Sequence, residues 1–199
     1  MIIYKTKDEI ELLRESSLLV GKTLAEVAKL INLGITTAEL DKIAEEYILD
    51  NNAKPGFKGL YGCPSTLLTS VNEAVVHGLP TDKPLKEGDI VSVDCGVLKN
   101  GFYGDSAYTF KIGEVSKEVQ KLLDVTQSCL EKAIEQARVN NTIGDIGFAV
   151  QLEAEKNGFS VVRDLVGHGL GRALHEKREV PNFGRKGKGT TIKCGLVIA

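Results

Sequence analysis

Apolar residues in the first part of the chain recur every three or four positions, which is typical of one face of an amphipathic helix. From Lys7 to about Leu33 the positions on this face are Ile10, Leu13, Ser17 (a small substitute), Val20, Leu24, Val27 and Ile31. The run Thr36-Thr-Ala-Glu39 has the pattern of a capping box and predicts the start of a second helix. That helix buries a stripe that includes Leu40 and Ile48, and it closes at Asn51-Asn52.

The middle of the chain changes to the pattern of strands. Thr66–Val71 predicts one strand, and the stretch from Asp89 to about Ile112 predicts two more, joined at Asn100-Gly101. Both turn residues accept the positive φ that a type I′ hairpin turn needs. With the turn there, counting outward along the two strands places Asp105 opposite Gly96.

A second helix pair is predicted from near Val115. Its first member has an apolar stripe at Val119, Leu122, Leu123, Leu130, Ala133 and Ala137, and Thr142-Ile-Gly-Asp145 opens its partner. Phe159–Val162 then predicts a strand, which Gly167-His168-Gly-Leu-Gly171 interrupts, and Leu196–Ala199 predicts the start of another.

The two helix pairs show a faint internal repeat. A shift of 106 positions aligns Thr36 with Thr142 and Asn51 with Asn157. Each pair precedes strands, so we predict an α+β fold with two pseudo-equivalent halves around one sheet. We expect residues 1–199 to form a single domain.

Composition narrows the class of protein. Hydrophobic residues make up 42% of the chain, enough for a sizeable core, and the net charge of −2 gives no overall case for binding DNA or a membrane. The four cysteines show no zinc-finger spacing, which favours free thiols in a reduced cytosol. The start of the chain lacks the pattern of a signal peptide, and no apolar run is long enough to span a membrane, so we expect a cytoplasmic protein.

The hairpin carries the main candidate for chemistry. Side chains alternate between the faces of a sheet, so Asp94 shares a face with Gly96 and therefore with Asp105, at roughly 7–8 Å. Two carboxylates so placed repel each other unless a cation lies between them or one takes up a proton. We interpret the pair as a divalent metal site. The alternative is that Asp105 merely follows a turn and Asp94 has local partners in a strand.

Three histidines could join this site. His77, His168 and His175 each lie beside glycines or in turn-like sequence, where the backbone can approach a ligand closely. Carboxylates with an imidazole from His168 suit Mn²⁺, Fe²⁺, Co²⁺ or Zn²⁺ better than Ca²⁺. His77 and His175 would then hydrogen-bond the substrate or a tetrahedral intermediate. A purely structural role remains the alternative for each histidine, and a solvated loop is the simpler interpretation of the basic residues Arg185, Lys186 and Lys188.

Several motifs together resemble one enzyme family. They are Ser70-Val-Asn-Glu73, Val76-His77-Gly78, Asp89 to Asp94, Gly101-Phe-Tyr-Gly-Asp105, Gly167-His168-Gly-Leu-Gly-Arg172 and His175-Glu176. In this combination, which extends over essentially the whole chain, they resemble the type I methionine aminopeptidases of peptidase family M24.

The resemblance implies a fold, an activity and a set of site residues. The fold is the pseudo-two-fold "pita-bread" fold, with an antiparallel curved sheet and two helix pairs outside it. The activity is removal of the initiator methionine from nascent proteins with small second residues. Asp94, Asp105 and His168 would bind two divalent ions per subunit (Co, Mn, Fe, Zn or Ni), and His77 and His175 would be catalytic and contact the substrate. Phe57, Leu60 and Cys63 would line the methionine pocket.

The resemblance also implies partners and one departure from the family. We expect a monomer that binds nascent polypeptide N-termini, with the ribosome as a further partner and with neither DNA nor a membrane. The family has two glutamate ligands, the first in an Ile-Glu-Pro-like segment, and the sequence stops at Ala199, about where that segment would begin. We therefore expect the final strands to be missing and the 199-residue form to be weak or inactive. The alternative function is a non-catalytic module that binds nascent chains, the ribosome or another protein.

Overall fold

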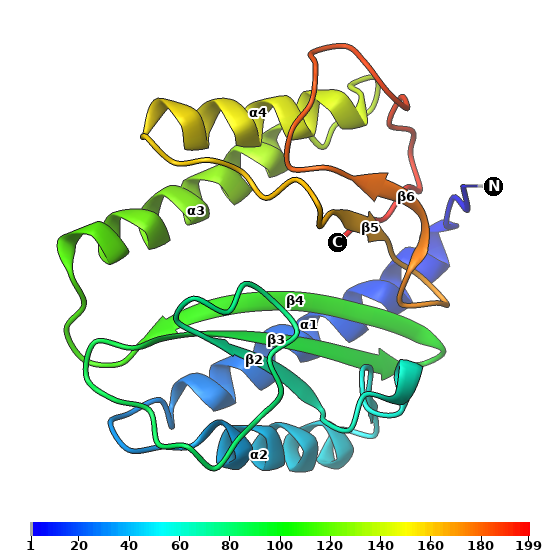
Figure 1. The fold of residues 1–199 in the computed structure, drawn as a ribbon. Helices are drawn as coiled ribbons and strands as arrows, with labels where there is room; N and C mark the ends of the chain where they lie inside the picture. The colour runs from blue at the N-terminus through cyan, green and yellow to red at the C-terminus, as the bar shows by residue number, and fades with distance from the viewer. Residues whose placement is uncertain (1) are drawn as a thin grey trace. The chain divides into compact units, whose positions relative to one another are not determined.

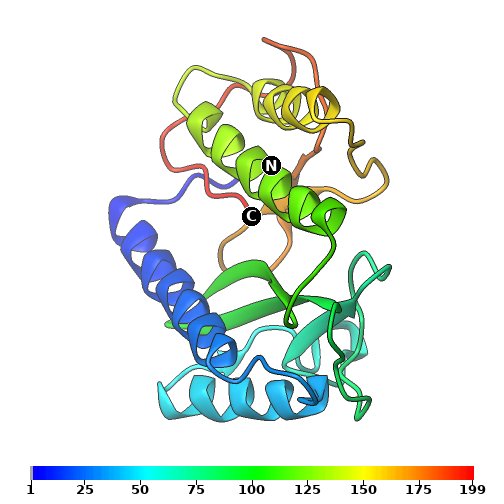
Figure 2. The ribbon, with the colours of Figure 1, turned by 90° about the vertical axis from the view of Figure 1, so that its left-hand side faces the viewer.

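The computed structural model describes residues 2–199 and divides them into two compact units. The larger unit consists of Asp8–Ser116 and Gly171–Leu174. The smaller unit consists of the N-terminal segment up to Lys7, Lys117–Leu170 and His175–Ala199. Figures 1 and 2 show the elements of each unit from two directions.

The larger unit places two helices on one face of an antiparallel sheet (Figure 1). Its elements in chain order are α1 (Lys7–Ala28), α2 (Thr37–Asp50), β1 (Lys54–Pro55), a 3-10 turn (Leu60–Gly62), β2 (Leu67–Val71), β3 (Ile90–Lys99) and β4 (Phe102–Lys111). Strand β3 is central: β1 and β2 pair with it along one edge and β4 along the other.

The core of this unit lies between the helices and β3. The inward-facing residues of β3 are fully buried: Val91, Val93, Cys95 and Val97. They pack with α1 and α2, whose buried side chains include Val20 and Leu40. Because residues alternate along a strand, the even-numbered residues of β3 point to the opposite face. The carboxylate of Asp94 is therefore directed away from the apolar core.

Helix α1 also fixes the end of the hairpin. The hydroxyl of Ser16 donates to the carbonyl of Lys99 at 3.2 Å or to that of Phe102 at 3.0 Å. A Cβ atom on Gly104 would lie 2.6 Å from the carbonyl carbon of Ser16, so only glycine lets the helix approach the strand this closely. The prediction that Ser17 lies on the buried face of this helix is wrong, since Ser16 is buried and Ser17 is exposed.

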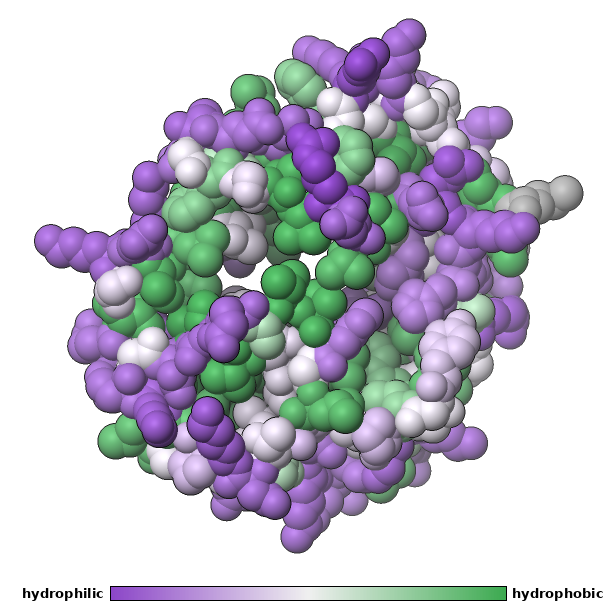
Figure 3. Space-filling model, viewed as in Figure 1, coloured by the Kyte–Doolittle hydropathy of each residue, from purple (hydrophilic) through white to green (hydrophobic). Residues whose placement is uncertain are grey.

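The smaller unit contains a helix pair and a short two-stranded sheet. Its elements are α3 (Lys117–Gln136), α4 (Ile143–Lys156), β5 (Gly167–Gly169) and β6 (Glu176–Val180). Two small apolar clusters hold it together, one around Val125, Cys129 and Ala154 and the other around Ile146 and Val180. Apolar side chains, drawn green in Figure 3, also appear at the surface of the molecule among the hydrophilic ones.

Several sequence-based element predictions are confirmed and others are wrong. The starts of α2 and α4 and the β3–β4 hairpin are where the sequence predicts them. The first helix ends at Ala28 instead of near Leu33. On α3 the predicted stripe is partly wrong: Leu122 and Leu130 are 39% and 54% exposed, and the buried Val125 and Cys129 were not predicted. Ala133 of the stripe does pack against the cluster around Ile146 and Val180.

Of the two strand predictions near the end of the chain, the first is wrong. Phe159–Val162 forms no strand; Phe159 and Val161 instead pack against the cluster around Cys129. The predicted start of a strand at Leu196–Ala199 is confirmed in part: Ile198 forms an antiparallel bridge with Gly169, and Ala199 exchanges two backbone hydrogen bonds with His168, each at 2.9 Å. Strands β1 and β6 were not predicted, because a two-residue strand and the charged run Glu176–Val180 carry no apolar alternation.

Candidate functional site

The β3–β4 hairpin brings two carboxylates together on one face of the sheet. Asn100 and Gly101 both have positive φ, 52° and 78°, as the predicted turn requires. The register pairs Gly96 with Asp105 and Asp94 with Ala107, which confirms that both aspartates point to the same face. Both are half-buried.

The pKa of the Cys95 thiol depends on its burial and on the charges of the two aspartates. Cys95 is fully buried, and burial raises its pKa well above the usual value of a cysteine. The negative charges of Asp94 and Asp105 raise that pKa further. The thiol therefore stays protonated and unreactive. Both aspartates lie close enough to Cys95 for their charges to act on its thiol.

The segment between β1 and β2 carries the predicted methionine-pocket residues. Phe57 is 6% exposed, and Leu60 and Cys63 are half-buried. Two carboxylates of α2 tether this segment: Glu45 pairs with Lys58 at 2.6 Å, and Asp41 accepts a hydrogen bond from the Leu67 N–H at 2.7 Å. Burial raises the pKa of Asp41 in spite of that hydrogen bond.

His77 occupies a strained and exposed turn in the same unit. Its φ is 60°, in the left-handed region that residues other than glycine seldom adopt. The turn is held against β2, because the Thr69 N–H donates to the Gly78 carbonyl at 2.6 Å and the Gly78 N–H donates to the Ser70 hydroxyl at 3.1 Å. Such strain, imposed by the surrounding structure, is a feature found at functional sites.

The other two histidines lie together in the smaller unit. The rings of His168 and His175 meet edge to face with their centroids 4.5 Å apart. Nδ1 of His168 lies 3.0 Å from the carbonyl oxygen of Gly169, an acceptor, so this contact assigns the proton to Nδ1 and makes Nε2 the lone-pair nitrogen. Neutral imidazole in this tautomer is a suitable metal ligand.

A buried ion pair lies next to His175. Glu176 pairs with Lys5 of the N-terminal segment, and both side chains are almost fully buried. The Lys5 N–H also donates to the carbonyl of Gly195 at 2.7 Å. This pair could not be predicted from the sequence, because nothing in the spacing of two residues so far apart relates one to the other.

The structure thus forms two groups of predicted site residues, one in each unit. The larger unit holds Asp94, Asp105 and His77, and the smaller unit holds His168 and His175. Across residues 2–199, no three histidine, cysteine or acidic side chains are grouped closely enough to hold a metal ion. The combined ligand set therefore stays a prediction. The donors themselves fit a divalent transition metal, since two carboxylates share a face and the imidazole has its lone pair on Nε2.

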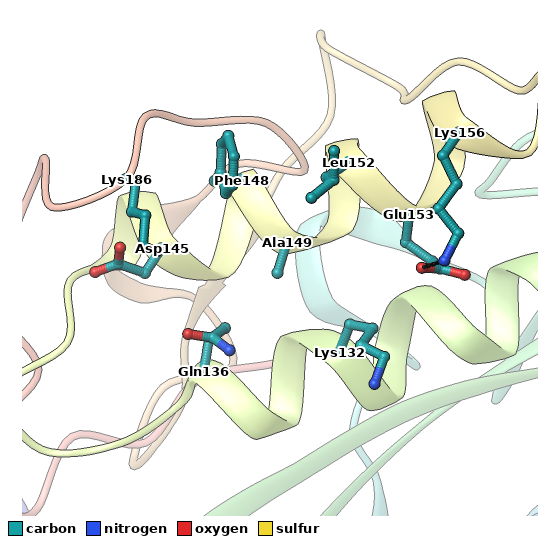
Figure 4. Close-up of a pocket in the computed structure, with 9 residues that line it drawn as sticks. All are labelled: Lys132, Gln136, Asp145, Phe148, Ala149, Leu152, Glu153, Lys156 and Lys186. Carbon is teal, nitrogen blue, oxygen red and sulfur yellow. Dashed lines mark hydrogen bonds and ion pairs between the residues drawn. The ribbon is translucent and has the colours of Figure 1, made fainter.

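A groove of about 250 Å³ on the smaller unit contains none of these residues (Figure 4). Helix α3 contributes Lys132 and Gln136, helix α4 contributes Phe148 and Leu152, and Lys186 approaches from the loop that follows β6. Its charged residues are of both signs, so the groove favours no one class of ligand.

Comparison with known proteins places these features in context. The profile of metallopeptidase family M24 matches residues 11–199. A methionine aminopeptidase from Clostridium perfringens is 51% identical over 199 residues, which is 100% of this chain and 80% of the relative. No helix within residues 2–199 is long and apolar enough to cross a membrane.

Solved structures agree with the sequence comparison. A crystal structure of methionine aminopeptidase from Thermotoga maritima has a TM-score of 0.97 at 42% identity, covering 100% of this chain and 80% of that one. Prolidase from Pyrococcus furiosus has a TM-score of 0.85 at 23% identity, covering 98% of this chain and 56% of that one, and shows the fold alone. These likenesses confirm the predicted pita-bread fold. From the match over nearly its whole length, this chain belongs to metallopeptidase family M24.

Proposed function

We propose that this chain hydrolyses the peptide bond after an N-terminal methionine, in nascent proteins whose second residue is small. The structural observation that carries the proposal is the pair Asp94 and Asp105 on one face of the hairpin. The similarity to proteins named methionine aminopeptidase, over the whole of this chain, supports the reaction and the substrate.

Three side chains are proposed as metal ligands. Asp94 and Asp105 would supply carboxylate oxygens and His168 would supply Nε2. The family site holds two ions, and Co, Mn, Fe, Zn and Ni all suit this donor set. A bound divalent ion would supply a water of lowered pKa and polarise the peptide carbonyl.

The remaining proposed site residues act on the substrate. His77 and His175 are exposed residues, so we expect their ring N–H groups to donate to the scissile carbonyl as it gains charge. Either imidazole could also pass a proton to the departing amide nitrogen. Phe57, Leu60 and Cys63 would receive the methionine side chain.

The proposal extends to where and with what the protein acts. We propose a cytoplasmic monomer that meets its substrates as they leave the ribosome. The exposed basic residues Arg185, Lys186 and Lys188 support contact with an anionic surface such as that of the ribosome. Co-sedimentation with ribosomes over a range of salt concentrations tests the contact, and sedimentation velocity tests the monomer.

The activity is tested with the tripeptide Met-Ala-Ser in the presence of Mn²⁺ or Co²⁺, with a known methionine aminopeptidase as positive control. We expect methionine release by a version extended past Ala199 to include the family's two glutamate ligands (the wild type of these assays), weak or no release by residues 1–199 alone, and none by Asp94→Asn. Ion binding is measured separately, by the shift in unfolding with added ion. At an ion concentration 100 times the Kd, a specific site stabilises the native state by about 2.7 kcal/mol. Asp94→Asn should lose most of this stabilisation.

Asp89→Asn is the matched control. Asp89 precedes β3 and accepts hydrogen bonds from Asn72 at 2.8 Å and from the Lys86 N–H at 2.9 Å, so it has a local structural role. Its substitution should leave ion binding unchanged. Equal ion-dependent stabilisation in Asp94→Asn and the wild type would refute the proposed ligands, and failure of the wild type to release methionine would refute the proposed activity.

A further inference from the structure

Gly96 lies on the carboxylate face of β3, directly opposite Asp105 and two residues from Asp94. Unlike Gly101 in the adjacent turn, Gly96 is not in the positive-φ region, so its backbone conformation does not call for glycine. The reason for a glycine at this position must therefore be space.

The ring of Phe57 fills that space. A Cβ atom on Gly96 would lie 2.5 Å from Cε1 and 2.8 Å from Cδ1 of Phe57, closer than real Cβ contacts allow. A side chain at position 96 would point to the same face of the sheet as Asp94 and Asp105. The aromatic ring thus lies on the face of the sheet that carries both carboxylates.

Contacts on both sides hold Phe57 there. On one side the Gly56 N–H donates to the Gly96 carbonyl at 2.7 Å, and a Cβ on Gly56 would lie only 2.7 Å from the Gly96 carbonyl carbon. On the other side Lys58 pairs with Glu45 of α2. Two close glycines and an ion pair therefore leave the ring little freedom to move away.

A second apolar residue continues the same surface. Leu68 of β2 pairs with Asp94 across the ladder and is half-buried. Leu68 is thus the cross-strand neighbour of Asp94, and the Phe57 ring covers Gly96, the residue opposite Asp105. An apolar surface beside carboxylates is suited to a substrate with an apolar side chain close to its reacting amide.

We propose that Gly96 determines which N-terminal side chain the site accepts, because its lack of a side chain lets the Phe57 ring line the carboxylate face. The inference rests on the proposed function. A flat ring accommodates an unbranched, flexible side chain, and the thioether of methionine makes a favourable contact with aromatic rings. The side chain of leucine, which branches at Cγ, fits such a surface less well.

The test compares the wild type with Gly96→Ala, Phe57→Ala and the double variant. The readout is the ratio of kcat/KM for Met-Ala-Ser to that for Leu-Ala-Ser. We expect the ratio to fall about tenfold or more in each single variant, a typical effect of changed apolar contacts in a pocket. In the Phe57→Ala background, Gly96→Ala should cost no further stability, since the clash is gone, while the ratio stays low.

A matched control separates selectivity from general damage. Val91→Ala removes a fully buried side chain from the opposite face of β3. It should lower stability and leave the ratio unchanged. An unchanged ratio in Phe57→Ala and Gly96→Ala, or an equal fall in Val91→Ala, would overturn the inference.

Amino-acid binding keeps the two proposals distinguishable. Titration of L-methionine and of L-leucine with Mn²⁺ present requires no turnover. If the wild type releases no methionine, the proposed activity fails, and tighter binding of L-methionine that Phe57→Ala abolishes would still support the role of Gly96. Equal binding of the two amino acids by the wild type would overturn it.

Discussion

Helices α2 and α4 begin in the same way, 106 positions apart, although they belong to different units. The backbone N–H of Thr36 donates to the Glu39 carboxylate at 2.9 Å, and that of Thr142 donates to the Asp145 carboxylate at 2.7 Å. Both arrangements are capping boxes. They satisfy helix N–H groups that have no partner within the helix.

The two helices also end alike. The side-chain amide of Asn51 donates to the Tyr47 carbonyl and that of Asn157 to the Glu153 carbonyl, each at 2.9 Å. The next residue has positive φ in both cases, 54° at Asn52 and 86° at Gly158. The repeat inferred from the sequence is therefore carried by the ends of the helices.

Between their ends the two helices contact their neighbours differently. Asp41 of α2 reaches a neighbouring strand with its side chain, at the Leu67 N–H. The equivalent residue of α4 is Gly147, where a Cβ would lie 2.3 Å from the carbonyl oxygen of Phe183. Helix α2 thus packs through side chains, whereas α4 admits another segment against its backbone. The helix ends follow a local rule common to both, and the interior follows what each helix packs against.

The largest expected effect concerns the core of α2. Ile48 is fully buried, and the equivalent residue of α4 is already alanine, Ala154. We expect Ile48→Ala to lower the free energy of unfolding by about 2–5 kcal/mol, because it leaves a cavity in the larger core. Urea unfolding measures the loss. The adjacent Leu49→Ala is the control, since Leu49 is 52% exposed and should change stability by less than about 0.5 kcal/mol.

If Ile48→Ala lowered the free energy of unfolding as little as Leu49→Ala does, the proposed difference between α2 and α4 would be refuted. It would mean that the region around α2 can collapse around an alanine as the region around α4 does, and that the two helices differ less in their packing than their contacts indicate.

The next effect concerns close backbone approach at α4. A Cβ on Gly144 would lie 2.3 Å from the carbonyl oxygen of Lys188 and 2.6 Å from that of Arg185. Gly144→Ala should therefore destabilise the protein by about 1–3 kcal/mol in spite of the better helix propensity of alanine. The equivalent residue of α2 is Ala38, and Ala38→Gly should cost only about 0.5–1 kcal/mol.

The sign of the stability change caused by Gly144→Ala decides whether α4 depends on this close approach. A gain in stability would show that the loop from Arg185 to Lys188 moves aside without cost, so that α4 would not depend on a close approach. Hydrogen exchange of the Gly144 N–H, which donates to the Lys188 carbonyl at 3.0 Å, reports directly whether the loop stays in place.

The sequence could predict those features of the fold that depend on residues close together in the chain. Capping boxes and the Asn100-Gly101 turn are decided within a few residues, and the turn then fixes the register that aligns Asp94 with Asp105. The common face of the two aspartates followed from alternation alone.

What the sequence could not show depends on contacts between distant segments. The Lys5–Glu176 pair and the Phe57–Gly96 contact join residues far apart in the chain. The stretch Phe159–Val162 has the apolar character of a strand, yet Phe159 packs against helices instead. A short apolar run does not distinguish these outcomes, because burial against a helix satisfies its side chains equally well.

The smallest expected effect concerns the two capping carboxylates and depends on pH. The Thr36 hydroxyl and then the Thr36 N–H lower the pKa of Glu39. For Asp145 the corresponding bonds from Thr142 are joined by one from the Gly187 N–H at 2.8 Å, and its pKa is lowered too. A carboxyl whose pKa is lower in the folded state stabilises that state above its unfolded-state pKa, and the stabilisation disappears as the pH falls through the folded-state value.

Glu39→Gln and Asp145→Asn should therefore each be less stable than the wild type at pH 7, and the differences should shrink on acidification through the usual carboxyl range. Asp145→Asn should show the larger difference, because only Asp145 also holds a loop through Gly187. The midpoint of urea unfolding as a function of pH measures both differences, with the exposed Glu46→Gln as control.

If the stability deficit of Asp145→Asn stayed constant down to acid pH, the ionised form of the carboxyl would not be what stabilises the start of α4. Equal deficits for the two variants would mean that the contact with Gly187 adds nothing, so that the two caps are equivalent in energy as well as in geometry.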